Sequence, residues 1–417
     1  MDDIVVGIDI GTSKICALVA RIRDGETLHI IGYGIQPSRG LKKGGITDLT
    51  ASSDAITRAV VEAEEMSNYK INSAVISLAG SHVSCVNSRA AVKIRGPKVS
   101  EYDIERALDQ AGQVAVPQDR VKIHVIQRSF TIDEQDGIQN PIDMKGSRLE
   151  VETHVITASN TAVENLREAV NRANIEVAQF VLKPLASAEA VLTDSERSMG
   201  AVVCDIGAGT TDLAIYVNGD VWHTMVLPFG GNHITQDIAY GLRLSFEAAE
   251  DLKIKYGHAI EHDMIYEDSV VVKSFGAEHP VRIKRSDLAM IIEARVAEIF
   301  DMALSEIKRS GYDGLLPAGM VITGGTANLS GIQNLASAVL RMPVRVANPQ
   351  PVEGMGKVME SPAFSTAIGL INWAAALQGL SLSSTEVERK PRFQKVPNES
   401  KSQLSDKFNA FVKRLMP

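Results

Sequence analysis

Several features are scarce in this chain of 417 residues. It has only three cysteines, Cys16, Cys85 and Cys204, and they are scattered singly. We therefore expect core cysteines in a reducing cytosol rather than disulfides or a metal site. The acidic start, Met1 followed by two aspartates, runs directly into an expected strand, so we expect no signal peptide. No apolar stretch reaches the roughly 18 residues that a membrane-spanning helix needs.

Positive charge and familiar catalytic motifs are also in short supply. The chain has 43 basic and 51 acidic residues, a net charge of −8, which argues against non-specific nucleic-acid binding. No Gly-x-x-x-x-Gly-Lys-Ser/Thr loop is present, which excludes a P-loop nucleotide site. No Ser-His-Asp or Cys-His arrangement stands out. His258 and His262 are four residues apart but lack a third ligand, so we expect no metal there.

The chain contains the same kind of turn sequence twice. Residues 9–14 follow the apolar run 4–6, and residues 205–212 follow the apolar run 201–204. Because a second apolar run comes after each turn, the pattern predicts two hairpins. The tip of such a hairpin offers backbone N–H groups and Thr or Ser hydroxyls to an anion.

Two such tips facing each other would hold the phosphates of one nucleotide from both sides. Asp9 and Asp205 would then be placed to hold the waters of a magnesium ion. Two copies that each open a similar half of the chain indicate a duplicated fold with a nucleotide between the halves. The predicted phosphate-side residues are Asp9, Gly11, Thr12, Ser13, Lys14, Asp205, Gly207, Ala208, Gly209, Thr210 and Thr211.

The adenosine side of the site is predicted at Gly324, Gly325 and Thr326, which follow another apolar strand. Two glycines there let the backbone approach a flat base or a ribose closely. Glu250 and Lys253 are three residues apart and share one face of an expected helix. A surface ion pair is the commoner explanation of such a pair, and contact with the ribose or adenine is the functional alternative.

The length of the chain predicts two or more lobes, because 417 residues exceed what one hydrophobic core usually serves. Residues 82–160 resemble a self-contained β-α-β-β unit, whose helix begins at a capping box formed by Ser100 and Asp103. We expect this unit to be an insertion in the first lobe. The predicted fold class is therefore α/β, duplicated, with a mixed sheet flanked by helices in each lobe.

The end of the chain has a different composition. Residues 380–402 are rich in Ser, Thr, Lys, Glu and Pro, which predicts a solvated linker. Residues 403–417 predict an amphipathic helix whose apolar side chains fall within an arc of roughly 60°. We favour a membrane surface over packing on the chain's own body, because the linker separates the helix from that body. The apolar face holds Leu404, Phe408, Phe411 and Leu415, and Lys407, Lys413 and Arg414 lie off it.

The paired hairpins and the Gly-Gly-Thr turn resemble those of the superfamily of actin, sugar kinases and heat-shock chaperone ATPases. Within that superfamily, the whole chain resembles the FtsA family of bacterial cell-division proteins. The resemblance covers both lobes, the insert and the terminal helix. The segments that carry it most clearly are 38–44, 137–141, 319–325 and 364–369.

The resemblance implies an actin-like body that binds ATP and magnesium and self-associates into filaments. It also implies nucleotide contacts for Glu250 and Lys253. The resemblance implies that residues 1–81, 161–196 and 347–379 form the first lobe and that residues 82–160 form the insert. The core of the second lobe would consist of residues 197–230 and 308–346, and its outer subdomain of residues 231–307. Residues 380–402 would form the linker and residues 403–417 the membrane-targeting helix.

The resemblance further implies a set of partners. Residues 231–307 would bind the tubulin-like division GTPase FtsZ, and residues 82–160 would help to recruit later division proteins. The terminal helix would tether the division ring to the cytoplasmic face of the bacterial inner membrane, at the division septum. The chain would thus be a peripheral membrane protein.

One departure from the superfamily bears on catalysis. Several actin-like filament ATPases carry a carboxylate or amide in the linking helix, where it orients the attacking water. Here residues 181–186 offer no such group before Pro184, and Glu189 lies further along. We expect nucleotide binding with slow hydrolysis at most, and we assign no catalytic residue. Ala208 stands where glycine is frequent, and its methyl group should be tolerated.

Two alternatives stay open from the sequence. A small-molecule kinase of the same superfamily would need a carboxylate base beside a substrate pocket, and it would have no use for a membrane helix. An actin-like pilus-assembly protein would share the fold and a place at the membrane. Those pilus proteins lack the terminal pattern described above.

Overall fold

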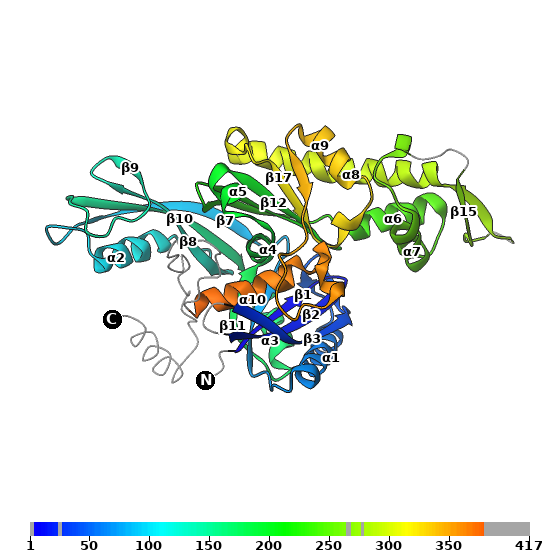
Figure 1. The fold of residues 1–417 in the computed structure, drawn as a ribbon, viewed down its shortest axis with the longest axis horizontal. Helices are drawn as coiled ribbons and strands as arrows, with labels where there is room; N and C mark the ends of the chain where they lie inside the picture. Colours follow the sequence, from blue (N-terminus) through cyan, green and yellow to red (C-terminus); the bar gives the residue numbers. More distant parts are fainter. Residues whose placement is uncertain (1–3, 24–26, 264–267, 277–278, 379–417) are drawn as a thin grey trace.

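The computed structural model describes residues 4–23, 27–263, 268–276 and 279–378. The predicted linker and terminal helix lie outside these residues. Two five-stranded sheets form the centres of two lobes. The inserted subdomain and the outer subdomain of the second lobe lie at opposite ends of the molecule's long axis (Figure 1).

The sheet of the first lobe has the strand order β11-β6-β1-β2-β3. Its first three strands form an antiparallel meander, and β6 and β11 extend it in parallel, so the sheet is mixed. The strands are β1 (Ile4–Ile10), β2 (Lys14–Arg23), β3 (Thr27–Pro37), β6 (Ser73–Leu78) and β11 (Glu176–Leu182).

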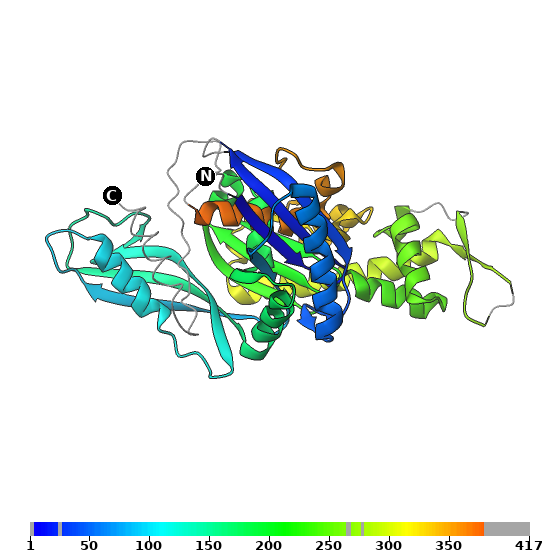
Figure 2. The same cartoon turned by 90° about the horizontal axis from the view of Figure 1, so that it is seen from below.

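Helices cover both faces of this sheet, which is why its central strands are apolar at nearly every position. Val6 and Ile8 of β1 share a core with α1 (Leu49–Ser67) and α3 (Asn160–Asn171). Figure 2 shows α1 lying across the strands on that side. Side chains on the opposite face of the sheet pack with the two central helices, which are α4 (Lys183–Val191) and α10 (Ser365–Leu377).

The sheet of the second lobe repeats the first, in the order β14-β13-β12-β17-β18. It too has an antiparallel meander followed by two parallel strands. The expected duplication of a mixed sheet is therefore confirmed. The strands are β12 (Ala201–Ile206), β13 (Thr211–Val217), β14 (Asp220–Leu227), β17 (Met320–Thr323) and β18 (Val344–Val346), and the helices around them are α5 (Asp194–Met199), α8 (Arg285–Ser310) and α9 (Ile332–Leu340).

The insert forms a separate four-stranded sheet, in the order β7-β10-β8-β9, with one helix against it. Ser100 and Asp103 form the predicted capping box at the start of that helix. The short strand β9 was not indicated by the sequence pattern. The elements are β7 (Ser84–Lys93), α2 (Glu101–Gly112), β8 (Arg120–Ile132), β9 (Gln135–Ile138) and β10 (Arg148–Ser159).

In the outer part of the second lobe, one helix packs against the N-terminal half of α8, a second helix packs against the first, and a small hairpin is added. Its elements are α6 (Gly231–Leu242), α7 (Phe246–Tyr256), β15 (Ser269–Val272) and β16 (Val281–Lys284). The remaining elements are β4 (Leu41–Lys42), β5 (Gly45–Ile46) and the 3₁₀ turns η1 (Glu261–Asp263), η2 (Asp313–Leu315), η3 (Gly325–Asn328), η4 (Lys357–Glu360) and η5 (Pro362–Phe364). Across the part of the chain that the structure describes, no helix has the length and apolar character to cross a membrane.

A buried histidine joins the insert to the second lobe. Nδ1 of His154 lies 2.7 Å from Oδ1 of Asn87, and its Nε2 lies 3.0 Å from Oγ1 of Thr224. Both contacts fit a neutral ring that donates to Asn87 and accepts from the Thr224 hydroxyl. Burial, followed by the nearby His223 and Arg128, lowers the pKa of His154 to about 3.

The crossing of α4 and α10 predicts that Gly369→Ala is strongly destabilising. A Cβ at Gly369 would lie 1.7 Å from the carbonyl oxygen of Ala186. Overpacking of this kind costs about 1–3 kcal/mol or more, which urea unfolding would measure. Gly314→Ala is the matched control, because a Cβ there meets nothing within 4 Å. Equal unfolding free energies for the two variants would contradict this packing.

The buried His154 predicts a defined dependence of stability on pH. Its pKa is lower in the folded chain, so it contributes stability above its unfolded pKa of about 6.5, and this is lost as pH falls. His154→Gln can keep both hydrogen bonds without titrating. Between pH 7 and pH 5, we expect the free energy of unfolding of the variant to fall by about 2 kcal/mol less than that of wild type, as measured by chemical unfolding. His262→Gln, at an exposed position, should keep the wild-type profile, and identical profiles for all three proteins would contradict the assignment.

Candidate functional site

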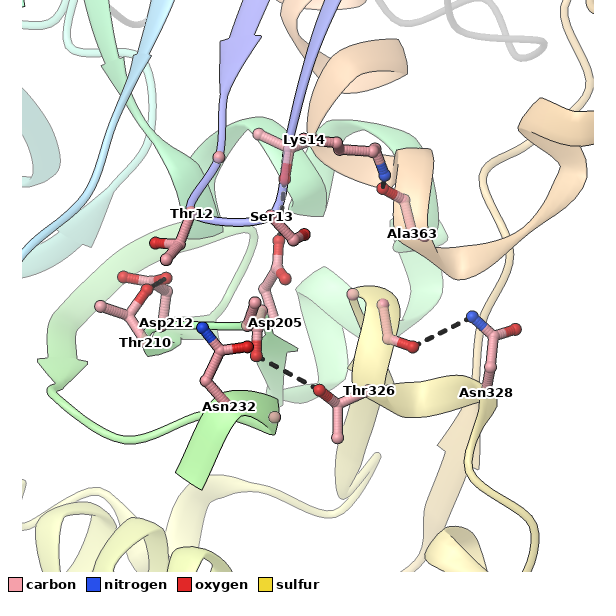
Figure 3. Close-up of a pocket in the computed structure, with 18 of the residues that line it drawn as sticks. Thr12, Ser13, Lys14, Asp205, Thr210, Asp212, Asn232, Thr326, Asn328 and Ala363 are labelled. Atoms are coloured by element: carbon pink, nitrogen blue, oxygen red, sulfur yellow. Dashed lines mark hydrogen bonds between the residues drawn. The ribbon is translucent and has the colours of Figure 1, made fainter. Parts of the chain in front are cut away.

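The two repeated turns meet at the centre of the molecule. One joins β1 to β2 and the other joins β12 to β13. A Cβ added to Gly209 would lie 2.5 Å from Oγ1 of Thr12, so the two tips are in contact. Both border one cavity of about 320 Å³ between the lobes. Figure 3 shows Thr12 and Ser13 of the first tip facing Thr210 across it.

The two tips have the same backbone closure. The N–H of Gly11 donates to the carbonyl of Lys14, and the N–H of Gly207 donates to the carbonyl of Thr210, both at 2.9 Å. A Cβ at Gly11 would lie 2.7 Å from that Lys14 carbonyl oxygen, so the first turn needs glycine there. The similarity of the two sequences therefore produces the same local structure twice.

Two carbonyl groups of the second tip already accept hydrogen bonds within the chain. The Gly207 carbonyl accepts hydrogen bonds from Gly231 N–H at 2.9 Å and from Oγ1 of Thr326 at 3.2 Å. The Ala208 carbonyl accepts from Asn232 N–H at 2.8 Å. Lone pairs that would repel an anion are thus occupied by the start of α6 and by η3.

Almost all the residues predicted from sequence line this cavity. The exception is Thr211, whose buried hydroxyl donates to the carbonyl of Phe229 at 2.9 Å. The predicted residues in the lining are Asp9, Gly11, Thr12, Ser13, Lys14, Asp205, Gly207, Ala208, Gly209, Thr210, Glu250, Lys253, Gly324, Gly325 and Thr326.

An ion pair sits beneath the first tip. The Nζ of Lys183 lies 2.8 Å from Oδ1 of Asp9, which also accepts a hydrogen bond from the Ser77 hydroxyl at 2.8 Å. Burial alone would raise the pKa of Asp9, but Lys183, together with Lys14 and Ser77, holds that pKa below its usual value. Burial likewise opposes charge on Lys183, yet Asp9 keeps the pKa of the lysine above its ordinary value. Both groups are therefore charged.

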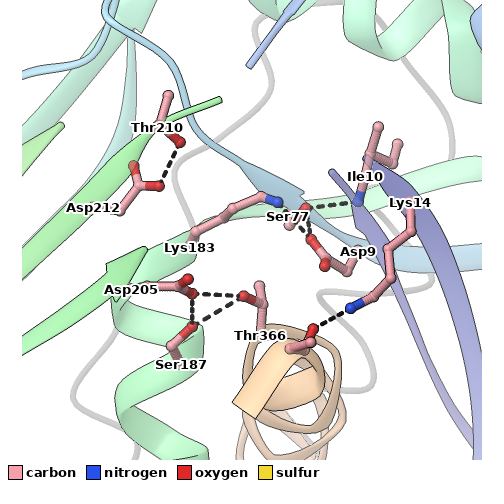
Figure 4. Close-up of polar contacts among 11 residues, drawn as sticks. Asp9, Ile10, Lys14, Ser77, Lys183, Ser187, Asp205, Thr210, Asp212 and Thr366 are labelled. Atoms are coloured by element: carbon pink, nitrogen blue, oxygen red, sulfur yellow. Dashed lines mark hydrogen bonds and ion pairs between the residues drawn. The ribbon is translucent and has the colours of Figure 1, made fainter. Parts of the chain in front are cut away.

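Two more buried carboxylates face the cleft, and their hydrogen-bond partners among the described residues are hydroxyl groups (Figure 4). Asp205 accepts from the hydroxyls of Ser187 and Thr366, and Asp212 accepts from the Thr210 hydroxyl at 2.8 Å. Burial raises the pKa of Asp205. Burial, followed by the charge of Asp205, raises the pKa of Asp212 to about 7. Negative charge at this wall is therefore costly in the absence of a cation.

The donor set on this wall fits a hydrated divalent cation. Oδ1 of Asp212 is buried and has no hydrogen-bond partner among the described residues. Magnesium prefers carboxylate oxygens and keeps several of its waters. Within residues 4–378, apart from those not described, no three acidic, histidine or cysteine side chains lie close enough to ligate one ion directly. Of the two residues predicted for this role, Asp205 could hold the waters of the ion together with Asp212, whereas Asp9 already has Lys183 as a charged partner.

The lysine of the first hairpin, Lys14, points elsewhere. The ammonium of Lys14 donates to the carbonyl of Ala363 and lies 3.8 Å from the centroid of the Phe364 ring. Burial lowers the pKa of Lys14, although Asp9 works in the other direction. Lys14 thus connects β2 to the turn before α10 and borders the cavity at the same time.

Glu250 and Lys253 lie together at the cavity wall. They form an ion pair at 2.7 Å, and both line the cavity. Lys253 also donates to the carbonyl of Gly231 at 3.1 Å and to the Thr235 hydroxyl at 2.8 Å. The pair therefore forms part of the cavity wall, and it fixes α7 to the start of α6.

The predicted adenosine turn also touches the phosphate side. Gly324 has φ of +88°, and a Cβ there would lie 2.4 Å from Oδ1 of Asp205. Only glycine fits both constraints. The Thr326 hydroxyl reaches the Gly207 carbonyl, as Figure 3 shows. The two halves of the predicted site are consequently one continuous surface.

Sequence reasoning missed several residues of the cavity, and Lys183 is the most important. The sequence did show a lysine directly before Pro184 at a helix start, but not that its side chain enters the cleft. Thr366 and Asn232 also line the cavity. Glu189 pairs with Arg197 at 2.9 Å and is not among the lining residues.

Solved structures with low sequence identity share the whole fold. A PilM-PilN type IV pilus biogenesis complex matches with a TM-score of 0.63 at 19% identity, over 89% of this chain and 98% of that one. The MreB5 protein of Spiroplasma citri, solved with ADP, matches with a TM-score of 0.54 at 16% identity, over 90% of this chain and 97% of that one. These similarities show an actin-like fold.

Similarity in sequence is more specific. A family model described as "Cell division protein FtsA" matches residues 202–369, and one described as "SHS2 domain inserted in FTSA" matches residues 80–157. "Cell division protein FtsA" of Pseudomonas aeruginosa is 40% identical over 91% of both chains. The protein of that name from Neisseria meningitidis is 40% identical over 89% of this chain and 90% of its own. The chain therefore belongs to the FtsA family.

Proposed function

We propose that this chain binds ATP between its lobes and acts in bacterial cell division as a membrane tether for FtsZ. The observation that carries the nucleotide part is the convergence of two matching glycine turns on one cavity. Its volume of about 320 Å³ lies within the range of small-molecule sites. The MreB5 protein with the same fold was solved with ADP. Relatives at 40% identity carry the name of a cell-division protein.

Each part of the site has a role in this proposal. The backbone N–H groups and hydroxyls of the two tips hold the phosphates, because they are hydrogen-bond donors that need no counter-charge. Gly324 and Gly325 leave room for the adenosine, and the pair Glu250 and Lys253 closes the outer wall. A magnesium ion held by Asp205 and Asp212 through water would offset the charge of the phosphates.

Hydrolysis is proposed to be slow. A water that attacks a phosphate is usually oriented by a carboxylate or amide that can accept its hydrogen bond. Lys183 stands at the start of α4, and its ammonium can only donate. ATP would then act chiefly by favouring a closed arrangement of the lobes that polymerises.

The outer parts of the molecule would serve partners. We assign FtsZ to the outer subdomain, residues 231–307, and later division proteins to the insert, residues 82–160. These two regions lie at opposite ends of the body, so both can be occupied at once (Figure 1). The first lobe would then consist of residues 1–81, 161–196 and 347–379, and the core of the second lobe of residues 197–230 and 308–346.

The terminal helix would supply reversible attachment to the cytoplasmic face of the inner membrane. Its four apolar side chains are worth roughly 1.5–3 kcal/mol each if fully buried, but an interfacial helix buries them in part and must also be ordered. A single helix therefore binds weakly. A polymer carries many such helices, which raises their effective concentration and gives firm attachment.

Membership of the FtsA family favours this role over the two alternatives. The likeness to the pilus complex rests on 19% identity and shows the fold alone. A small-molecule kinase would share that fold as well. The two relatives at 40% identity carry the name of a cell-division protein, which supports the division role directly.

A substitution at the contact of the two tips tests nucleotide binding. In Gly209→Val the new side chain would collide with Thr12 and hold the tips apart. We expect the Kd for a fluorescent ATP analogue, measured with magnesium, to rise at least about tenfold. Gly314→Val introduces the same side chain where a Cβ meets nothing within 4 Å, and it should bind as wild type does. Equal binding by both variants would refute the site.

Changes in the terminal helix test the tether. Pelleting with vesicles that contain phosphatidylglycerol should recover wild type with ATP, and much less of a chain lacking residues 404–417. Phe408→Asp removes an apolar contact and should act like the deletion, whereas Ser405→Asp adds the same charge off the apolar face and should have a small effect. All of these proteins should bind ATP normally. Equal pelleting of the Phe408→Asp and Ser405→Asp variants would exclude the amphipathic contact.

A further inference from the structure

Lys183 is a cleft residue whose presence the proposed function does not require. Its side chain is only 13% exposed and lines the cavity between the tips. Its Nζ lies 2.8 Å from Oδ1 of Asp9, and a Cβ at Gly11 would be 3.6 Å from the same nitrogen. The ammonium is therefore held directly beneath the first phosphate-facing tip.

The surroundings of Lys183 are strongly acidic. Figure 4 shows its amine reaching Asp9, with Asp205 and Asp212 on the neighbouring elements. The hydrogen-bond partners of Asp205 and Asp212 are hydroxyl groups, which carry no charge. Three carboxylates thus share the cleft in which we propose that a triphosphate binds. Charges at close range in such a cleft interact much more strongly than they do in water.

We propose that Lys183 is a built-in cation of the nucleotide site, which neutralises Asp9 and contacts the terminal phosphates, so that ATP binding depends only weakly on magnesium. This inference rests on the proposed binding of ATP. The lysine side chain is flexible and has three donors, so Nζ can contact Asp9 and a phosphate oxygen together. Lys183 is then a specificity-determining residue for nucleotide binding.

The position of Lys183 also limits what magnesium can do in this cleft. Oδ1 of Asp9 contacts both the lysine and Ser77, whereas the hydrogen-bond partners of Asp205 and Asp212 are uncharged, so a hydrated ion would be needed most at those two carboxylates. Without Lys183, Asp9 would be a buried carboxylate lacking a counter-charge. A divalent cation would then be needed both to relieve Asp9 and to offset the phosphates.

The test compares two conditions in the full-length protein. The Kd for a fluorescent ATP analogue is measured with magnesium and again with excess EDTA, and the ratio of the two values is taken. Lys183→Met removes the charge and keeps most of the volume. Lys183→Gln removes the charge but retains a donor to Asp9, and it decides the outcome if the Met variant does not fold. Lys14→Met is the matched control, because Lys14 is another cleft lysine whose ammonium bonds to Ala363 instead.

We expect wild type and Lys14→Met to show similar ratios, although the control binds more weakly in both conditions. The ratio for either Lys183 variant should be at least about tenfold larger, which corresponds to about 1.4 kcal/mol. The same ratio in all the proteins would overturn the role of Lys183 while leaving ATP binding intact. Absence of wild-type binding even with magnesium would instead overturn the proposed function.

A second measurement needs no nucleotide. Thermal melts of the nucleotide-free proteins are recorded with and without magnesium chloride alone. The Lys183 variants should melt at lower temperature than wild type, because Asp9 has lost its partner. Magnesium should restore part of that loss and should raise the melting temperature of wild type much less. An equal response of wild type and variants to magnesium would count against the built-in cation.

Discussion

The contact between two glycine turns is the constraint on which the rest of the structure depends. Thr12 and Gly209 touch because β1 and β12 end at the same place, each at the centre of its own sheet. The helices α4 and α10 make this possible by crossing between the sheets at Gly369. A tight helix crossing, two matching sheets and one shared cavity are therefore parts of a single arrangement.

This arrangement brings three carboxylates close together, and their repulsion is reduced by different contacts. Asp9 is paired with a lysine, whereas Asp205 and Asp212 are met by hydroxyls and have raised pKa values. Asp9 thus has a counter-charge within the chain, whereas on the proposed function a hydrated cation that accompanies the nucleotide would supply one at Asp205 and Asp212.

Much of the fold could be predicted from the sequence, because a repeated turn between apolar runs specifies the same hairpin twice. The capping box at Ser100 and the apolar stripe of α1 are likewise local signals. Contacts between distant segments were not predictable from such signals. The side chain of Lys183 enters the cleft because it directly follows β11, which lies next to β6 and close to β1 in the sheet. The hydrogen bond from Thr211 to Phe229 depends on the path of the chain after β14. The short strand β9 has too few residues to show the alternation of apolar and polar side chains that indicates a strand.

On the proposed function, both tips bind the phosphates of one nucleotide. The most direct test is a crystal or cryo-electron microscopy structure of the protein with a non-hydrolysable ATP analogue. We expect phosphate density in contact with Thr12 or Ser13 on one side and with Gly209 or Thr210 on the other. We also expect the base to lie next to Gly325. A nucleotide that touches only one of the two tips, or that binds outside this cavity, would contradict it.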